Sequence, residues 1–144
     1  MSEIKRIEWS AALETGVPAM DAQHRELIRL IQAMVAHHER GSIYSEMLVT
    51  YKELVGWAVK HFDDEEAFQE SIDFPGLKAH RIAHDKLKGR AVEYLNQLES
   101  GTVDVVSLIN FLSNWLTNHI IKMDTRYGQH AKAGKTSKRS SRLF

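Results

Sequence analysis

The chain has 144 residues, no cysteine and a formal net charge of zero. This length predicts one domain with a single core, and the absence of cysteine excludes disulfides and thiolate metal sites. The N-terminus carries charges where a signal peptide needs an apolar run, and no segment has the apolar length of a membrane span. We therefore expect a soluble, cytoplasmic protein.

The zero net charge hides an uneven distribution along the chain. Residues 129–144 contain five basic residues and no acid, which leaves 19 acids against 14 bases in residues 1–128. No basic face remains for the folded part, and this argues against a nucleic-acid partner. We expect residues 129–144 to form a basic, flexible tail that is a solubilising end or a weak electrostatic contact.

The N-terminal part predicts an arm followed by a helix. Residues 1–17 lack helical periodicity, so we expect an extended arm with Trp9 as its anchor on the body. A helix is expected from Pro18, which suits a first helical turn, up to Gly41, which stops it. Apolar residues recur along it at steps of three and four, and His24 lies on the same stripe.

Three further amphipathic segments follow. The first ends in the turn at 73–76, where proline and glycine break the helix. The next closes before Gly101. The last is capped by Thr102 or Asp104, and Gly128 ends it. Four long helices with short connections predict an all-α, antiparallel up-down-up-down four-helix bundle with an extended N-terminal arm.

Histidines and a glutamate occupy inward positions on these helices. Residues four apart share a helix face, which pairs His61 with Glu65 and His80 with His84. The turn between the two helices directs one pair at the other. Imidazole and carboxylate donors suit iron, zinc, copper or nickel, whereas burying such groups without a partner is unfavourable. The inward-facing set predicts one shared metal centre, made by His24, His61, Glu65, His80, His84 and His119.

Asp124 does not follow from spacing alone. It comes five residues after His119, which places it about 140° away on an ideal helix. It can join the centre if the two residues straddle the inward face, or if a local π-type widening brings it round.

The spaced motifs resemble those of the hemerythrin family, specifically its single-domain bacterial members. The resemblance covers about residues 9–128, with all seven ligand positions filled. The motifs are Asp21-x-Gln23-His24, His61-Phe62-x-x-Glu65-Glu66, His80-x-x-x-His84 and His119-x-x-x-x-Asp124-x-x-Tyr127.

The resemblance implies a non-haem diiron centre that binds O2 reversibly. In it, Glu65 and Asp124 bridge the irons beside an oxo or hydroxo group. One iron keeps an open position for O2 and has two histidines, His24 and His61. The other iron is completed by His80, His84 and His119. The matching apolar pocket around the open iron consists of Leu27, Phe62, Trp115, Leu116 and Ile120.

Other polar residues are expected outside the ligand set. Glu66 points about 100° away from Glu65 on an ideal helix. Tyr127 and Asp21 match family positions and are expected to have structural or supporting roles. The remaining histidines are expected at the surface or at helix ends, and they are His37, His38 and His130.

The resemblance favours an oxygen-binding monomer without enzymatic activity, for O2 storage, transport or delivery to an oxygen-consuming enzyme. Five neutral imidazoles and two carboxylates give little anionic donation, whereas ferritin-like oxygen-activating bundles use four carboxylates. The alternatives are a diiron redox enzyme that reduces peroxide or nitric oxide or oxidises iron, an O2 or redox sensor module, and a structural dizinc site. The run from His80 to His84 lacks the glutamate of H-E-x-x-H metalloproteases, so we exclude protease chemistry.

Overall fold

The computed structural model describes residues 3–42 and 44–142, with side chains up to Gly134. These ranges contain helices, turns and an extended arm, and no strand. A 3-10 turn at Ala11–Leu13 interrupts the arm, and a π-helical segment at Ile120–Asp124 joins the last two helices. The helices are α1 (Pro18–Glu39), α2 (Tyr44–Ser71), α3 (Leu77–Ser100), α4 (Val105–His119) and α5 (Thr125–Arg142).

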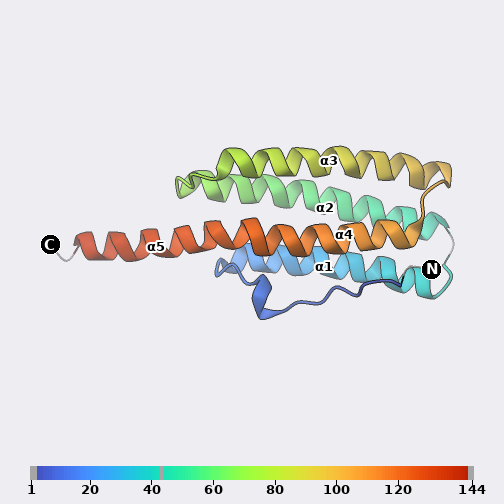
Figure 1. Ribbon diagram of the computed structural model, residues 1–144, viewed down its shortest axis with the longest axis horizontal. Helices are drawn as coiled ribbons and strands as arrows, with labels where there is room; N and C mark the ends of the chain where they lie inside the picture. Colours follow the sequence, from blue (N-terminus) through green and yellow to red (C-terminus); the bar gives the residue numbers. More distant parts are fainter. Residues whose placement is uncertain (1–2, 43, 143–144) are drawn as a thin grey trace.

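The helices form an antiparallel bundle in which consecutive helices are joined by short connections, as Figure 1 shows. Helix α1 packs on α2 and α4, and α2 packs on α3. Helix α5 continues the line of α4 through the π segment and projects beyond the ends of the other helices (Figure 1). The predicted all-α four-helix fold is confirmed.

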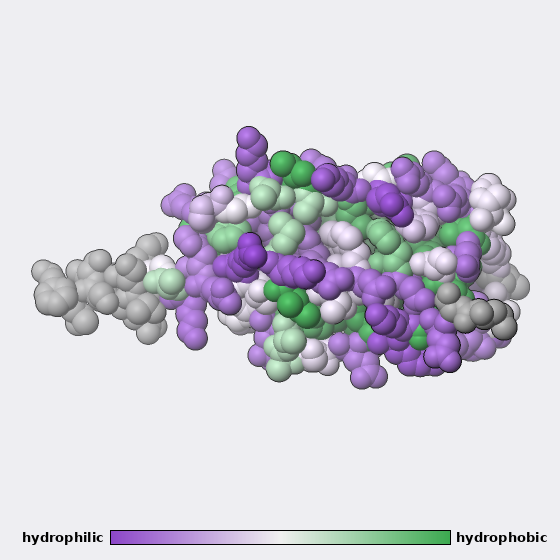
Figure 2. Space-filling model, viewed as in Figure 1, coloured by the Kyte–Doolittle hydropathy of each residue, from purple (hydrophilic) through white to green (hydrophobic). Residues whose placement is uncertain are grey.

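Antiparallel alternation gathers the inward histidines at one end of the bundle, and the apolar core extends from there to the other end. The inward histidines lie early in α1 and α3 and late in α2 and α4, so they meet at one end. The other end holds fully buried side chains such as Met34, Tyr51, Leu98 and Leu108. On the face drawn in Figure 2, hydrophilic side chains are widespread and apolar ones form small scattered groups. No helix in the described ranges combines the length and apolar character needed to cross a bilayer.

The helix ends agree with the predicted turn chemistry except at one glycine. Gly41 and Gly101 follow α1 and α3 with φ of 67° and 75°, a left-handed conformation that glycine adopts without strain. Of the two predicted caps of α4, Asp104 is used, because its carboxylate accepts a hydrogen bond from the Val106 backbone at 3.2 Å.

The prediction that Gly128 ends the last helix is wrong. Helix α5 runs through it to Arg142, and residues 143–144 lie outside the described residues. The glycine serves close packing, because a Cβ at this position would lie 1.9 Å from the Thr15 carbonyl oxygen of the arm. Flexibility of residues 129–144 stays a prediction.

Replacing Gly128 with alanine should destabilise the protein by about 1–3 kcal/mol, because the arm must shift away from the new methyl group. Gly89 in α3 is a matched control, since nothing lies within 4 Å of a Cβ built there. Gly89→Ala should stabilise the helix by up to about 1 kcal/mol. Urea unfolding of both variants measures the difference, and equal shifts in the same direction would contradict the packing role of Gly128.

Apolar residues hold the arm on the bundle. Trp9, the expected anchor, is half-buried and packs against the core cluster, and Ile7 and Leu13 are buried within that cluster. The Arg25 guanidinium also lies 4.4 Å from the Trp9 ring centroid, which is a cation–π contact. The Asp21 carboxylate ties the arm to α1 by accepting hydrogen bonds from the backbone and hydroxyl of Thr15, at 2.9 and 2.8 Å.

Candidate metal centre

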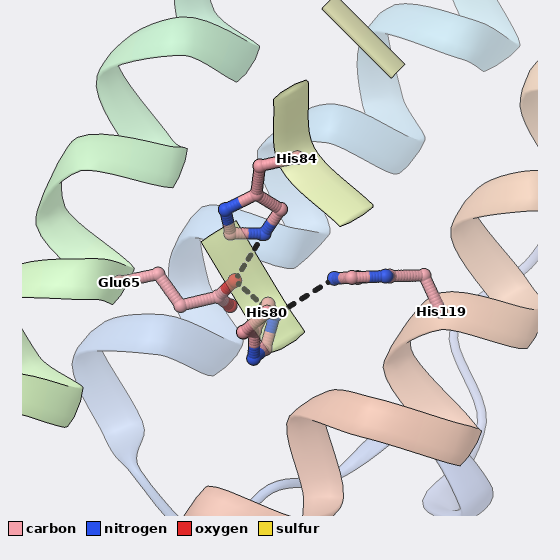
Figure 3. A group of neighbouring side chains, drawn as sticks. All are labelled: Glu65, His80, His84 and His119. Atoms are coloured by element: carbon pink, nitrogen blue, oxygen red, sulfur yellow. Dashed lines mark hydrogen bonds and ion pairs between the residues drawn. The ribbon is translucent and has the colours of Figure 1, made fainter. Parts of the chain in front are cut away.

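The Glu65 carboxylate lies between two pairs of imidazoles. Its Oε2 is 3.1 Å from His24 Nε2 and 3.2 Å from His61 Nε2. Its Oε1 is 3.2 Å from His80 Nε2 and 3.1 Å from His84 Nε2. Figure 3 shows Glu65 facing His80 and His84, with His119 approaching from α4. Each oxygen of this carboxylate therefore faces a different pair.

Asp124 enters the same centre because the helix widens locally. The five residues Ile120–Asp124 form a π-helical segment, and this confirms the second of the two arrangements expected for Asp124. Its Oδ2 lies 3.0 Å from His24 Nε2. Its Oδ1 lies 2.9 Å from His80 Nε2 and 3.1 Å from His119 Nε2.

The side chains form two groups with ligand atoms within 4.8 Å of one another. The two-histidine group consists of His24, His61, Glu65 and Asp124. The three-histidine group consists of Glu65, His80, His84 and His119, with Asp124 Oδ1 adjoining it. The structure thus brings all seven predicted site residues together, with the carboxylates shared between the groups.

The polar atoms at the centre fit bound cations better than hydrogen bonds to one another. Both oxygens of Asp124, Oε1 of Glu65 and Nε2 of His84 are buried without a hydrogen-bond partner in the described part of the chain. Yet His84 Nε2 and Glu65 Oε1 are only 3.1 Å apart. These atoms are close together without the geometry of a hydrogen bond, and the donor atoms of each group lie within 4.8 Å of one another. Nitrogen and oxygen donors in this set suit iron, zinc, copper or nickel.

Comparison with known proteins decides the family. The profile of the Hemerythrin HHE cation binding domain matches residues 15–131. The chain belongs to the hemerythrin family. The bacteriohemerythrin of Methylococcus capsulatus is 30% identical over 122 residues, 83% of this chain and 92% of that protein. That of Stenotrophomonas maltophilia is 29% identical over 126 residues, 87% of this chain and 81% of that protein.

Solved hemerythrin structures share the fold. The crystal structure of a wild-type hemerythrin superposes with a TM-score of 0.78 at 28% identity, covering 87% of this chain and 97% of that one. The crystal structure of a leucine-to-alanine mutant of hemerythrin gives a TM-score of 0.78 over 86% of this chain and 95% of that one. The helical bundle therefore has the hemerythrin fold.

Without metal, protons occupy the centre of this hemerythrin domain. Burial disfavours the charged form of His24 and of His80, but the Asp124 and Glu65 carboxylates outweigh it and raise the pKa of each histidine to about 9. Burial acts to raise the pKa values of Glu65 and Asp124, yet the surrounding histidines hold both pKa values well below their ordinary range. Metal binding must therefore displace protons from the imidazoles.

The metal-free protein should lose stability as pH rises from about 6.5 to about 9. The folded-state pKa of His24 and His80 lies above the ordinary value of 6.5, so their contribution is fully present below that pH and disappears as pH rises through about 9. For each of these histidines, a pKa shift of this size corresponds to about 3 kcal/mol of unfolding free energy. Urea unfolding at pH 6.5 and 9.5 measures it, and a metal-free protein equally stable at both would contradict the prediction. The zinc-loaded protein should not show this loss.

Two imidazoles are oriented by hydrogen bonds on their outer side. His61 Nδ1 donates to Gln23 Oε1 at 2.6 Å, and His84 Nδ1 donates to Glu66 Oε2 at 2.8 Å. These bonds leave each Nε2 lone pair for the centre. The Tyr127 hydroxyl donates to Glu65 Oε2 at 2.7 Å. Glu66 lies outside the ligand set, as expected, but its contact with His84 did not follow from its place on the helix.

Apolar side chains cover the centre. Leu27, Phe62, Leu116 and Ile120 are buried and Trp115 is half-buried. The Phe62 ring stacks on His84 at 4.0 Å between centroids, and the Trp115 ring stacks on His119 at 4.4 Å. The Phe62 ring also lies 5.8 Å from the His61 ring, so it borders both groups, whereas the Trp115 ring lies against the three-histidine group. The assignment of these five residues to an O2 pocket stays a prediction.

His37 and His130 lie outside this centre, as expected. His37 accepts or donates hydrogen bonds with Ser42 and Thr50 at the turn between α1 and α2. His130 contacts the Ile72 carbonyl oxygen at 3.1 Å, where α5 passes the end of α2. Both histidines therefore join neighbouring elements.

Proposed function

We propose that this hemerythrin domain binds O2 reversibly at a non-haem diiron centre, for oxygen storage, transport or delivery. The observation that carries the proposal is the unequal division of imidazoles between two groups that share Glu65. Asp124 belongs to the two-histidine group and also contacts His80 and His119. The group with one histidine fewer has room for an external ligand. The relatives named bacteriohemerythrin support this reading.

The two groups assign the ligands of the proposed irons. His24 and His61 would hold the iron with the open position, and three imidazoles from α3 and α4 would hold the other. Glu65 and Asp124 would bridge them. When bound, a diferrous pair would supply the two electrons that reversible O2 binding requires.

The surrounding residues favour carriage over turnover. An enzyme that reduces O2 needs a proton donor, and the side chains predicted to line the open position are apolar. The Tyr127 hydroxyl is already engaged, because it donates a hydrogen bond to Glu65 Oε2 at 2.7 Å and holds this carboxylate in place.

Anaerobic ferrous reconstitution followed by visible spectra under alternating air and argon tests the proposal. We expect about two irons per chain, matching the two donor groups, and an absorption band that appears in air and vanishes under argon. Irreversible conversion to the diferric form would favour a redox enzyme. A protein that takes up no iron would overturn the proposal.

We further propose that the protein acts in the cytoplasm as a monomer and passes O2 to an oxygen-consuming enzyme. Sedimentation of the iron-loaded protein tests the assembly state. A stable dimer would contradict it.

A further inference from the structure

We infer that Glu66 is a positioning residue that strengthens His84 as a metal ligand, so that the three-histidine group fills first and holds its ion more tightly. The inference rests on the two-ion centre proposed above. Glu66 follows the proposed bridging residue Glu65 in the sequence, but the Glu66 side chain turns away from the centre.

Glu66 contacts the outer nitrogen of a fully buried imidazole. Its Oε2 accepts the Nδ1–H of His84 at 2.8 Å, and its Oε1 accepts a hydrogen bond from Arg81 Nε at 3.2 Å. The glutamate side chain is 17% exposed, so water only partly screens its charge. A carboxylate in this position fixes the imidazole tautomer and raises the basicity of the Nε2 that faces the metal.

The other group has a weaker partner at the matching place. His61 Nδ1 donates to Gln23 Oε1 at 2.6 Å, and this acceptor is a neutral amide. The carboxylate behind this amide is one hydrogen bond further away, on Asp64, which accepts from Gln23 Nε2 at 2.9 Å. Lys60 pairs with Asp64 much as Arg81 pairs with Glu66, so the difference between the two histidines lies in the intervening amide. The polarising charge on His61 is therefore smaller than that on His84.

The other imidazoles do not offset this difference. His24 Nδ1 and His80 Nδ1 are buried and lack a hydrogen-bond partner in the described ranges, one in each group. An ion pair between Glu66 and the half-exposed Arg81 would by itself contribute little to stability. The contact between Glu66 and His84 is therefore the feature that acts on the metal.

Stepwise Co²⁺ dissociation constants of the metal-free full chain, measured by competition with a chelating dye, test the inference. We expect Glu66→Gln to raise the smaller dissociation constant, that of the tighter site, by about 10- to 100-fold. This is the usual effect of losing an outer partner of a metal ligand. The amide still accepts from His84, so the fold and the far-UV circular dichroism should not change. The larger dissociation constant, that of the two-histidine group, should stay within about threefold of wild type, because Gln23 is unchanged.

Two further variants separate the role of Glu66 from a general charge effect. Glu70 is 73% exposed and lies 3.7 Å from the same Arg81, so Glu70→Gln removes the same charge without touching a histidine. It should leave both constants unchanged. Gln23→Glu combined with Asp64→Asn places a carboxylate directly behind His61, and the new amide can donate to it in place of the present hydrogen bond between Gln23 and Asp64. This double variant should lower the dissociation constant of the two-histidine group.

The outcomes distinguish this inference from the proposed function. Equal effects of Glu66→Gln and Glu70→Gln on both constants would overturn the inference and leave the two-ion centre standing. A wild-type chain that binds fewer than two Co²⁺ ions would overturn the centre itself. At one equivalent of Co²⁺, the hyperfine-shifted Nδ1–H signal of His84 should appear before that of His61, and the reverse order would overturn the inference.

Discussion

Glu65→Gln should remove both metal ions from the protein, whereas His61→Ala should remove only one. The two oxygens of Glu65 face different imidazole pairs, at 3.1 to 3.2 Å. A neutral amide keeps the volume but cannot supply an anionic oxygen to each ion. The loss for each ion should exceed the roughly 10- to 100-fold that is typical of outer partners. Metal analysis after zinc loading and desalting measures the number of ions retained.

The His61→Ala variant tests whether Glu65 is shared between the two ions. His61 Nε2 approaches only Oε2 of Glu65, at 3.2 Å, and belongs to the two-histidine group. A His61→Ala protein should therefore keep the ion of the other group. Retention of one tightly bound zinc by Glu65→Gln would show that its carboxylate serves a single ion. Circular dichroism of both metal-free variants checks that the bundle is intact.

The fold could be predicted because helical periodicity and turn chemistry agree along most of the chain. Apolar steps of three and four defined each helix, and Gly41 and Gly101 lie where the backbone needs a left-handed residue. The donor set could be predicted for the same reason. Residues four apart on two helices, such as His80 and His84, must share a face whatever the tertiary structure.

Periodicity could not decide the place of Asp124. An ideal helix directs it away from His119, and only the π segment Ile120–Asp124 brings it to the centre. Spacing allowed this widening as one of two arrangements. The family motif indicated Asp124 as a ligand, but it did not indicate the backbone conformation.

Contacts between distant segments explain the remaining differences. Glycine often ends a helix, and the sequence therefore predicts a stop at Gly128. Its lack of a side chain is instead required by the close approach of Thr15, more than a hundred residues earlier in the chain. Glu66 points off the inward stripe of α2, yet α3 brings His84 within 2.8 Å of it. The sequence periodicity of one helix does not show which residues of other segments contact its sides.

Leu116→Asn should accelerate autoxidation of the oxygenated protein by about tenfold or more. Leu116 is buried in α4 one turn before His119, in the set predicted to keep the O2 site dry. A dry site hinders proton delivery, and protons promote irreversible electron loss to oxygen. A hydrogen bond to a charged group contributes about 1.5–3 kcal/mol, and each 1.4 kcal/mol changes a rate about tenfold. The decay of the oxygenated spectrum in air measures the rate.

Leu116→Met provides the matched control, because it changes the shape of the side chain but leaves the site apolar. Its autoxidation rate should stay close to that of wild type if polarity is the cause. Equal acceleration by both variants would assign the effect to packing instead, and an unchanged rate in Leu116→Asn would remove Leu116 from the pocket. The buried amide should also destabilise the fold by about 1–3 kcal/mol. Iron content and thermal unfolding must therefore be measured on the same samples, so that the rate is compared between fully loaded, folded proteins.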